Sequence, residues 1–281
     1  MSDVDKVFAG SIPENYDRYL VPLIFDGFAE ELAQRAASLA PKTVLETAAG
    51  SGVVTRALAP RLAADASYIA TDLNQPMLDY AARRQPADRP IGWRQADAQA
   101  LPFEDAAFDL VCCQFGVMFF PDRQAGYREA RRVLRPGGRF LFNVWDRIEE
   151  NVFANDVTNA LADFFPGDPP RFLARTPHGY HDISLIRREL EQAGFSSIMI
   201  ETRERQSCAA SPRHPAMAFC QGTPLRNEIE AREAGKLEAA TDYAASVIAG
   251  RHGRGEIAAR IQAHVIVAIP AAGLILPAQS P

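Results

Sequence analysis

The residues Val44–Leu58, "VLETAAGSGVVTRAL", combine one acid with a run of small side chains between two apolar segments. Gly50 and Gly52 would let a ligand approach the backbone closely, and a helix after them would present free N–H groups at its N-terminus. A dinucleotide fingerprint needs the spacing G-x-G-x-x-G, which this stretch lacks, and Glu46 would repel a pyrophosphate. The pattern therefore favours a ligand that carries positive charge.

Strands and helices that alternate along the chain must hold this loop in place. We expect strands at residues 44–46, 67–71, 91–95, 108–115, 139–145, 197–201 and 263–269, with helices at 25–39, 53–62, 76–84, 123–133 and 183–193. The run Phe108–Phe115 is almost continuously apolar, which is typical of a strand buried on both faces. The alternation predicts an α/β fold with a doubly wound, mostly parallel, seven-stranded Rossmann-like sheet.

Two blocks interrupt this alternation after Trp145. One is a helical segment at 152–165 followed by a loop rich in Pro and Gly, and the other runs from Arg203 to about Arg260 with helices expected at 215–221, 226–233 and 236–249. We expect both blocks to form a partly helical cap over the site. The predicted organisation of residues 1–281 is one domain, with a core at about 25–146, 183–203 and 262–270 and cap or substrate segments at about 1–24, 147–182 and 204–261.

The composition of the chain limits which partners the protein is expected to bind and where in the cell it is expected to be. The formal net charge of −5 gives no bulk attraction to nucleic acid or to an anionic membrane. The apolar run Val265–Leu276 is shorter than the roughly 20 residues that a membrane-spanning helix needs. The cysteines form no CxxC pair and the N-terminus lacks an apolar core, so we expect a cytoplasmic protein without a signal peptide. The Pro-rich tail 270–281 would pack on the sheet or on a second subunit, which leaves a homodimer open.

Four motifs in order resemble those of the class I S-adenosylmethionine (SAM)-dependent methyltransferases. "VLETAAGSG" is similar to their first motif, D/E-x-G-x-G-x-G, with Ala48 in place of the first glycine. "YIATDLNQPML", "QADAQALPFEDAAFDLVCCQFG" and "VLRPGGRFLF" are similar to the later motifs. The resemblance covers roughly residues 15–193 and is nearest to the small-molecule branch, methyltransferase type 11, which includes ubiquinone/menaquinone-biosynthesis enzymes. It implies transfer of a methyl group from SAM to a small organic acceptor, with release of S-adenosylhomocysteine.

The resemblance also implies which residues contact SAM. Asp72 would hold both ribose hydroxyls, Asp97 would accept from the adenine amino group, and Glu46 would attract the ammonium group directly or through water. The segment "PENYDRYL" is similar to one that closes over SAM in such proteins. Contacts to SAM are expected at Tyr16, Tyr19, Glu46, Ala48, Gly50, Gly52, Asp72, Leu73, Met77, Asp97, Ala98, Gln114 and Phe115.

No residue is assigned a catalytic role, because aligning the acceptor with the methyl group is the main requirement of this reaction. His181 and Tyr180, in "TPHGYHD", are candidates for acceptor binding, although a surface loop is the plainer interpretation. No metal is expected, because His178 and His181 on a loop make a poor metal pattern. Four cap aromatics are candidates for the acceptor pocket or for the cap's own core: Phe165, Phe172, Tyr180 and Phe219.

Three other functions stay open at the level of sequence. A nucleic-acid or protein methyltransferase on the same fold is disfavoured by "QFGV", where an "NPPY"-like motif would follow the fourth strand, and by the acidic net charge. A NAD-dependent oxidoreductase is disfavoured by the missing third glycine of its fingerprint. A SAM-binding protein without catalysis is compatible with every motif, because the chemistry needs no fixed catalytic residue.

Overall fold

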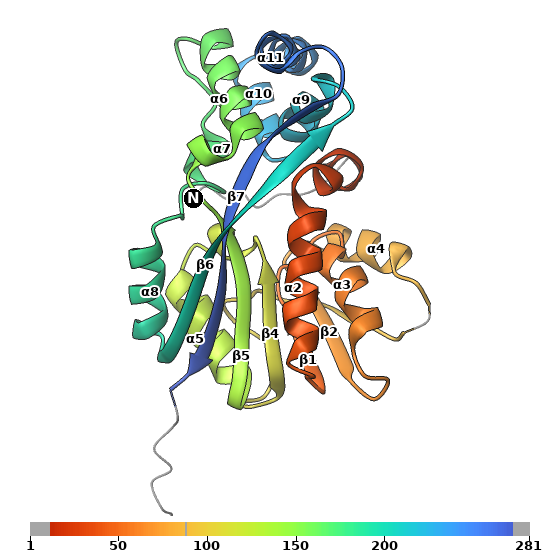
Figure 1. Ribbon diagram of the computed structural model, residues 1–281, viewed down its shortest axis with the longest axis vertical. Helices are drawn as coiled ribbons and strands as arrows, with labels where there is room; N and C mark the ends of the chain where they lie inside the picture. The colour runs from red at the N-terminus through yellow and green to blue at the C-terminus, as the bar shows by residue number, and fades with distance from the viewer. Residues whose placement is uncertain (1–11, 88, 272–281) are drawn as a thin grey trace, which may run out of the picture.

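The computed structural model describes residues 12–87 and 89–271, and within them a seven-stranded sheet has the order β3-β2-β1-β4-β5-β7-β6 (Figure 1). The strands are β1 Thr43–Glu46, β2 Ser67–Asp72, β3 Gly92–Gln95, β4 Phe108–Gln114, β5 Leu134–Trp145, β6 Phe195–Ala209 and β7 Ile257–Pro270. Strands β1 to β5 pair in parallel, and β7 runs antiparallel to both β5 and β6. The doubly wound, mostly parallel sheet that the sequence predicts is confirmed.

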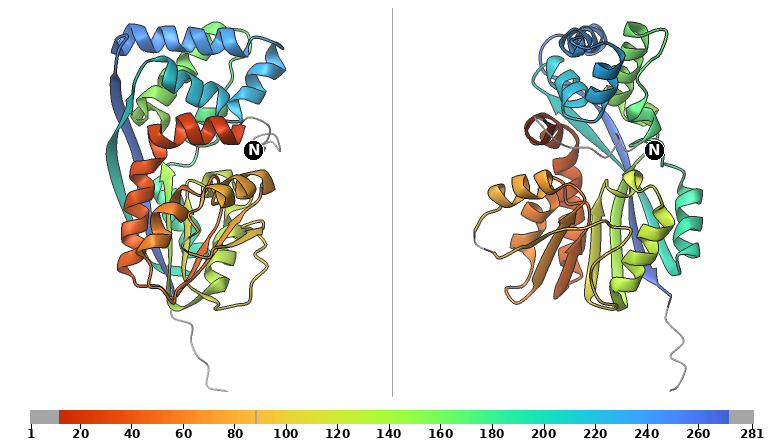
Figure 2. Two further views of the ribbon diagram at one scale, coloured as in Figure 1. Left: turned by 90° about the vertical axis from the view of Figure 1, so that its right-hand side faces the viewer. Right: turned by 180° about the vertical axis from the view of Figure 1, so that it is seen from behind.

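Helices cover both faces of this sheet and form a separate layer above its carboxyl ends (Figures 1 and 2). They are α1 Ile12–Asn15, the π-helix η2 Tyr16–Phe25, α2 Asp26–Ser38, α3 Val53–Leu58, α4 Gln75–Arg84, α5 Arg123–Val133, α6 Val152–Phe164, α7 Phe172–Arg175, α8 Ile183–Gln192, α9 Arg213–Gln221, α10 Leu225–Arg232 and α11 Leu237–His252. The upper layer consists of α6, α7, α9, α10 and α11. The sequence predicts helices near α6, α9, α10 and α11, whereas α7 lies in the stretch that is expected to be a loop.

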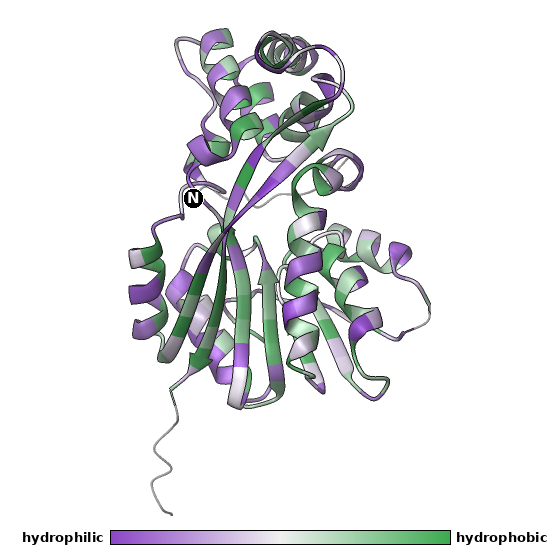
Figure 3. Cartoon of the chain, viewed as in Figure 1, coloured by the Kyte–Doolittle hydropathy of each residue, from purple (hydrophilic) through white to green (hydrophobic). Residues whose placement is uncertain are grey.

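Strand β4 shows how the sequence builds a core on each face of the sheet. Leu110 and Cys112 belong to the core beneath α2 and α3, whereas Val111 and Cys113 belong to the core beneath α5 and α8. Successive side chains of a strand point to opposite faces, so an unbroken apolar run serves both cores. Figure 3 shows the same feature as continuous apolar colouring along the central strands.

The last two strands are much longer than the sequence predicts. Their pairing runs from Phe195 with Pro270 to Ala209 with Ile257, so residues 203–209 and 257–260 are strand and not part of an irregular insertion. Along β7 the side chains of Ile257, Ala259 and Ile261 are buried while their neighbours are more exposed, the period-two pattern of a half-buried strand. In β6 the less exposed positions include the polar residues Arg205 and Ser207, so the same alternation is not visible as an apolar–polar pattern in the sequence. This twisted hairpin carries α9, α10 and α11 away from the sheet (Figure 1).

The N-terminal segment lies between the sheet and the cap, where Figure 2 shows it crossing above the core. Helix η2 contacts α9 of the cap and continues into α2 of the core. Asp17 of η2 is buried and pairs with Arg56 and Arg84, each at 3.3 Å, and it accepts a hydrogen bond from the Tyr80 hydroxyl. These contacts fasten η2 to α3 and α4. The apolar tail beyond Ala271 and the first eleven residues lie outside the described part of the chain.

Candidate functional site

The loop after β1 turns through left-handed backbone conformations that open a cradle at the end of the strand. Ala48, Gly50 and Gly52 have φ angles of 52°, 56° and 79°. The Gly50 N–H donates to Asp72 Oδ2 at 2.9 Å, which ties the loop to the end of β2. A Cβ on Gly52 would come 2.9 Å from the Cβ of Ala81, so this glycine is needed for close packing against α4.

A cavity of about 830 Å³, here called the main cavity, opens at the carboxyl ends of β1, β2, β3 and β4. Ligands of doubly wound α/β proteins bind at this edge of the sheet. The predicted contact residues that line it are Tyr16, Ala48, Gly50, Asp72, Leu73, Met77, Asp97, Ala98, Gln114 and Phe115. The other lining residues are Asn74, Ala96, Gln99, Gly116, Phe119, Phe120 and Pro121.

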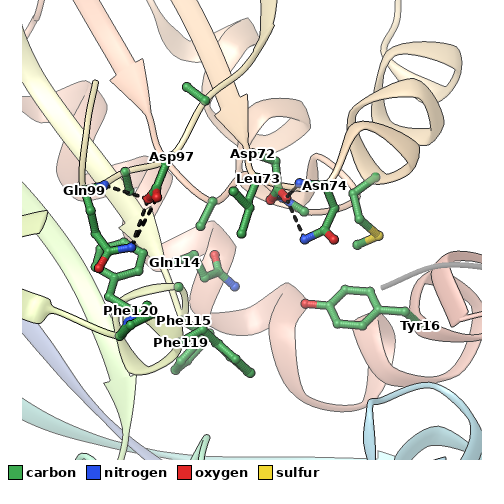
Figure 4. Close-up of a pocket in the computed structure, with 17 residues that line it drawn as sticks. Tyr16, Asp72, Leu73, Asn74, Asp97, Gln99, Gln114, Phe115, Phe119 and Phe120 are labelled. Atoms are coloured by element: carbon green, nitrogen blue, oxygen red, sulfur yellow. Dashed lines mark hydrogen bonds between the residues drawn. The ribbon is translucent and has the colours of Figure 1, made fainter. Parts of the chain in front are cut away.

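Two carboxylates stand on one wall of the main cavity, each held by its own loop (Figure 4). Asp72 Oδ1 accepts the Asn74 N–H at 2.8 Å, and Asp72 is only 7% exposed. Burial raises the pKa of Asp72, and the backbone N–H groups of Asn74 and Gly50 oppose that rise. Asp97 Oδ1 accepts the N–H of Gln99 at 2.9 Å. Both acids are therefore oriented before any ligand arrives.

The floor of the main cavity is a strained turn at the end of β4. Phe115 has a φ of 51°, which is uncommon for an aromatic residue and is retained only where surrounding contacts enforce it. Its N–H donates to the carbonyl oxygen and to the side-chain Oδ1 of Asn143, and its ring stacks on Trp145 with centroids 3.8 Å apart. Gln114 Nε2 donates to the Phe25 carbonyl, while the buried Oε1 has no hydrogen-bond partner among the described residues.

Tyr16 closes the cavity from the side of the N-terminal segment. Figure 4 shows its hydroxyl directed into the cavity from η2, across from Asp72 and Gln114. Burial is the main cause that raises the pKa of Tyr16, and the negative charge of Asp72 adds to it, so the phenol stays protonated. The ring stacks on Phe25 with centroids 5.2 Å apart. Tyr16 thus presents a fixed hydroxyl to anything bound below it.

A second cavity of about 480 Å³, here called the side cavity, shares Tyr16, Phe115 and Phe119 with the main cavity. Its other lining residues are Leu20, Ile24, Phe25, Trp145, Phe172, Leu173, Pro177, His178, Phe219, Thr223 and Pro224. They come from η2, the end of β5 and the cap. The wall is apolar except for a few polar groups, as expected of a site for a small organic molecule.

Several predicted site residues lie elsewhere. Glu46 is 1% exposed and lines neither cavity; its Oε2 accepts hydrogen bonds from Thr55 and Tyr68, each at 2.6 Å. Glu46 therefore points toward α3 and β2, and its carboxylate does not face the side of the loop that lines the main cavity. Gly52 also lines neither cavity, and Tyr19 packs edge-on against His214.

The two candidates for acceptor binding are likewise outside both cavities. Tyr180 is buried and bonds through its hydroxyl to Tyr127 and Glu189, which belong to α5 and α8. His181 Nδ1 lies 2.9 Å from the carbonyl oxygen of His178. Of the cap aromatics, Phe172 and Phe219 line the side cavity, whereas Phe165 does not.

His178 and Trp145 are two of the lining residues that sequence reasoning missed. His178 is 6% exposed and its Nδ1 lies 2.9 Å from the Asp146 carbonyl oxygen. Burial lowers the pKa of His178 to about 4, so the imidazole is neutral at physiological pH. The sequence feature that could have pointed to His178 is its place in the loop "TPHGYHD". The spacing of the two histidines in that loop does not say which of them turns toward the cavity.

Over residues 12–87 and 89–271, no group of three or more His, Cys, Asp or Glu side chains is arranged to hold a metal ion. In the same part of the chain, none of the helices has both the length and the apolar character needed to cross a membrane.

Known proteins with similar sequences are methyltransferases. Residues 45–142 match the family model described as "Methyltransferase domain". The chain is similar to the ubiquinone/menaquinone biosynthesis C-methyltransferase UbiE of Paraburkholderia phymatum, with 32% identity over 165 residues that span 55% of this chain and 68% of the relative. UbiE of Burkholderia cenocepacia is 31% identical over the same shares of both chains.

Solved structures show the same fold at lower sequence identity. The YcgJ protein of Bacillus subtilis has a TM-score of 0.56 and 19% identity, covering 88% of this chain and all of its own length (100%). A SAM-dependent methyltransferase of Thermotoga maritima has a TM-score of 0.56 and 15% identity, covering 96% of this chain and 100% of its own.

The ordered motifs, the sheet and the relatives lead to one assignment. The chain belongs to the class I SAM-dependent methyltransferases, enzymes that use SAM as methyl donor.

Proposed function

We propose that SAM occupies the main cavity and that the acceptor occupies the side cavity, with methyl transfer where the two meet. The observation that carries this proposal is the shared wall: Tyr16, Phe115 and Phe119 line both cavities. Cavities that share these side chains adjoin each other, so a donor and an acceptor that fill them would lie side by side along these rings. Holding reactants in this way supplies much of the acceleration of a bimolecular reaction.

The donor groups of the main cavity suit the parts of SAM. Asp72 Oδ2 accepts the Gly50 N–H, which leaves it a lone pair for one ribose hydroxyl. Asp72 Oδ1 accepts the Asn74 N–H and a longer bond of 3.4 Å from Asn74 Nδ2, and the second ribose hydroxyl would replace that longer bond. Asp97 is placed to accept from the adenine amino group, beside the backbone of Ala98. The orphaned Gln114 Oε1 would gain a partner from the ammonium group of the amino-acid part. These assignments support the predicted SAM contacts except those at Glu46, Gly52 and Tyr19.

The reaction needs alignment and exclusion of water more than acid–base machinery. SAM supplies a methyl group activated by a positively charged sulfur. Tyr16, Phe115 and Phe119 present aromatic groups at the junction of the cavities, where cation–π attraction would favour that charge. The fixed turn at Phe115 keeps the wall in one position. We propose that no divalent metal takes part, since the cavities offer oriented carboxylates already bonded to backbone N–H groups.

The acceptor is proposed to be small and largely apolar, because the side cavity is lined mainly by aromatic and aliphatic side chains. The relatives' printed name describes C-methylation in ubiquinone and menaquinone biosynthesis, and a ring-bearing acceptor of that general kind fits the same wall. A nucleic-acid or protein acceptor would need a more open and more polar approach. The core-and-cap division of the chain, the cytoplasmic location and the homodimer stay predictions.

Calorimetry with SAM, S-adenosylhomocysteine and NAD tests the assignment of the main cavity. We expect both SAM and its product to bind and NAD not to bind. Binding of NAD without SAM would overturn the proposal.

A screen of small apolar acceptors with labelled SAM then tests turnover. We expect a chelator to leave the rate of methyl transfer unchanged. Activity that is lost on adding the chelator and restored by Mg²⁺ or Zn²⁺ would refute the proposal that no metal takes part.

A further inference from the structure

His178 is the one histidine that lines the side cavity, among residues the structure describes, and it comes from the loop between α7 and α8. It sits beside Trp145, with ring centroids 6.1 Å apart. The surrounding wall consists of Leu20, Ile24, Leu173 and other apolar side chains. A polar ring atom in such a wall is costly unless a ligand or water satisfies it.

The contact at Nδ1 fixes which ring nitrogen carries the proton. The Asp146 carbonyl oxygen can only accept, so a distance of 2.9 Å requires that Nδ1 bears hydrogen and donates it. In a neutral imidazole the other nitrogen, Nε2, then holds a lone pair and can only accept. No hydrogen bond to Nε2 comes from the described residues.

The Asp146 carbonyl group, which sets this tautomer, follows the end of β5 and is fixed by hydrogen bonds from neighbouring side chains. Asn151 Nδ2 donates to the same Asp146 oxygen at 3.3 Å, and the Asp146 side chain accepts from Gln262 at 2.6 Å. His264 and His181 are the nearby titratable groups that interact with Asp146. Since burial dominates over the charges of Asp146 and Glu149, which act the other way, the ring remains neutral.

We infer that the acceptor is an apolar, ring-sized molecule with a hydroxyl group that donates a hydrogen bond to His178 Nε2. This inference rests on the proposed function, in which the acceptor fills the side cavity. A molecule without a donor would leave Nε2 unsatisfied, so His178 discriminates between a hydroxylated compound and its ether. The same contact orients the ring against Trp145 and against Phe115, which lines both cavities.

A pair of probes, 2-naphthol and 2-methoxynaphthalene, tests this inference by calorimetry on the full chain saturated with S-adenosylhomocysteine. The probes differ in one hydrogen-bond donor. We expect the naphthol to bind about five- to tenfold more tightly, the scale of one net hydrogen bond. In His178→Phe the ratio should fall to about one, while His178→Gln, which restores an acceptor, should recover part of it.

The control is His214→Gln, because His214 bonds to the backbone oxygen of Tyr19 and does not line the side cavity. It should keep the wild-type ratio, and thermal melting should show that each variant is folded. Equal binding of both probes by the wild type, no binding of naphthol, or an unchanged ratio in His178→Phe would overturn the inference. Failure of S-adenosylhomocysteine itself to bind would instead defeat the proposed function.

Discussion

At the scale of single residues, Asp72 has two roles, since it holds the loop at Gly50 and presents free lone pairs to the main cavity. We predict that Asp72→Asn weakens SAM binding by about 1.5–3 kcal/mol, roughly 10- to 150-fold, because hydrogen bonds to a charged group are lost. Calorimetry measures the change. The exposed Asp79→Asn, on α4, should bind SAM as the wild type does. Unchanged affinity in Asp72→Asn would show that the ribose is held elsewhere.

The buried carboxyl group of Glu46 leads to a prediction about the stability of the fold. Burial raises its pKa from 4.5 to about 7, against the opposing hydrogen bonds from Thr55 and Tyr68. The folded state therefore binds a proton that the unfolded state has lost, so this contribution to stability is complete below pH 4.5 and disappears as pH rises through 7. Relative to wild type, Glu46→Gln should gain up to about 3 kcal/mol in the free energy of unfolding between pH 4.5 and pH 8.

Urea denaturation at several pH values measures this gain. The exposed Glu104→Gln is the matched control and should show a difference from wild type that does not vary with pH in the same way. A constant difference for Glu46→Gln across the range would mean that Glu46 is ionised throughout.

At the scale of elements, helix η2 contributes Tyr16 to the wall of the main cavity, and we propose that it acts as a lid held in place by Asp17. Its carboxylate joins η2 to Arg56 of α3 and Arg84 of α4, and Tyr16 is the residue immediately before it. We predict that Asp17→Asn weakens SAM binding about tenfold, or about 1.4 kcal/mol, because Tyr16 no longer stays over the main cavity. Calorimetry and limited proteolysis of the N-terminal segment measure the effect. The exposed Glu14→Gln should change neither; equal protease resistance in both variants would contradict the lid.

At the scale of the whole molecule, we propose that the sheet binds the donor and that the cap selects the acceptor. Phe172 and Phe219 line only the side cavity, whereas Phe165 lines neither. We predict that Phe172→Leu and Phe219→Leu raise the KM for an acceptor by about 5- to 50-fold, the scale of about 1–2.3 kcal/mol of lost apolar contact, and leave the Kd of SAM within about twofold. Phe165→Leu is the control. Parallel loss of SAM and acceptor affinity would show that the cap belongs to the donor site.

The amino-acid sequence was sufficient to predict the parallel strands of the sheet, the loop after β1 and most of the wall of the main cavity. These depend on local patterns: apolar runs such as Phe108–Phe115 set the strands, and Gly50 permits the left-handed turn. Strand ends of a parallel sheet meet at one edge, so Asp72 and Asp97 could be brought together by reasoning from the chain order alone. The family resemblance identified SAM as the methyl donor that those residues would bind.

Only the tertiary structure decided which side chains of a segment face a cavity. Glu46 ends β1, but its carboxylate turns toward Thr55 and Tyr68, whose hydroxyl groups both donate to it. His178 and His181 are three residues apart in one loop, and the bond from His178 to the Asp146 carbonyl selects the former. The side cavity joins η2, β5 and the cap, which are far apart along the chain. Its shape depends on how these elements pack, and no local periodicity encodes that.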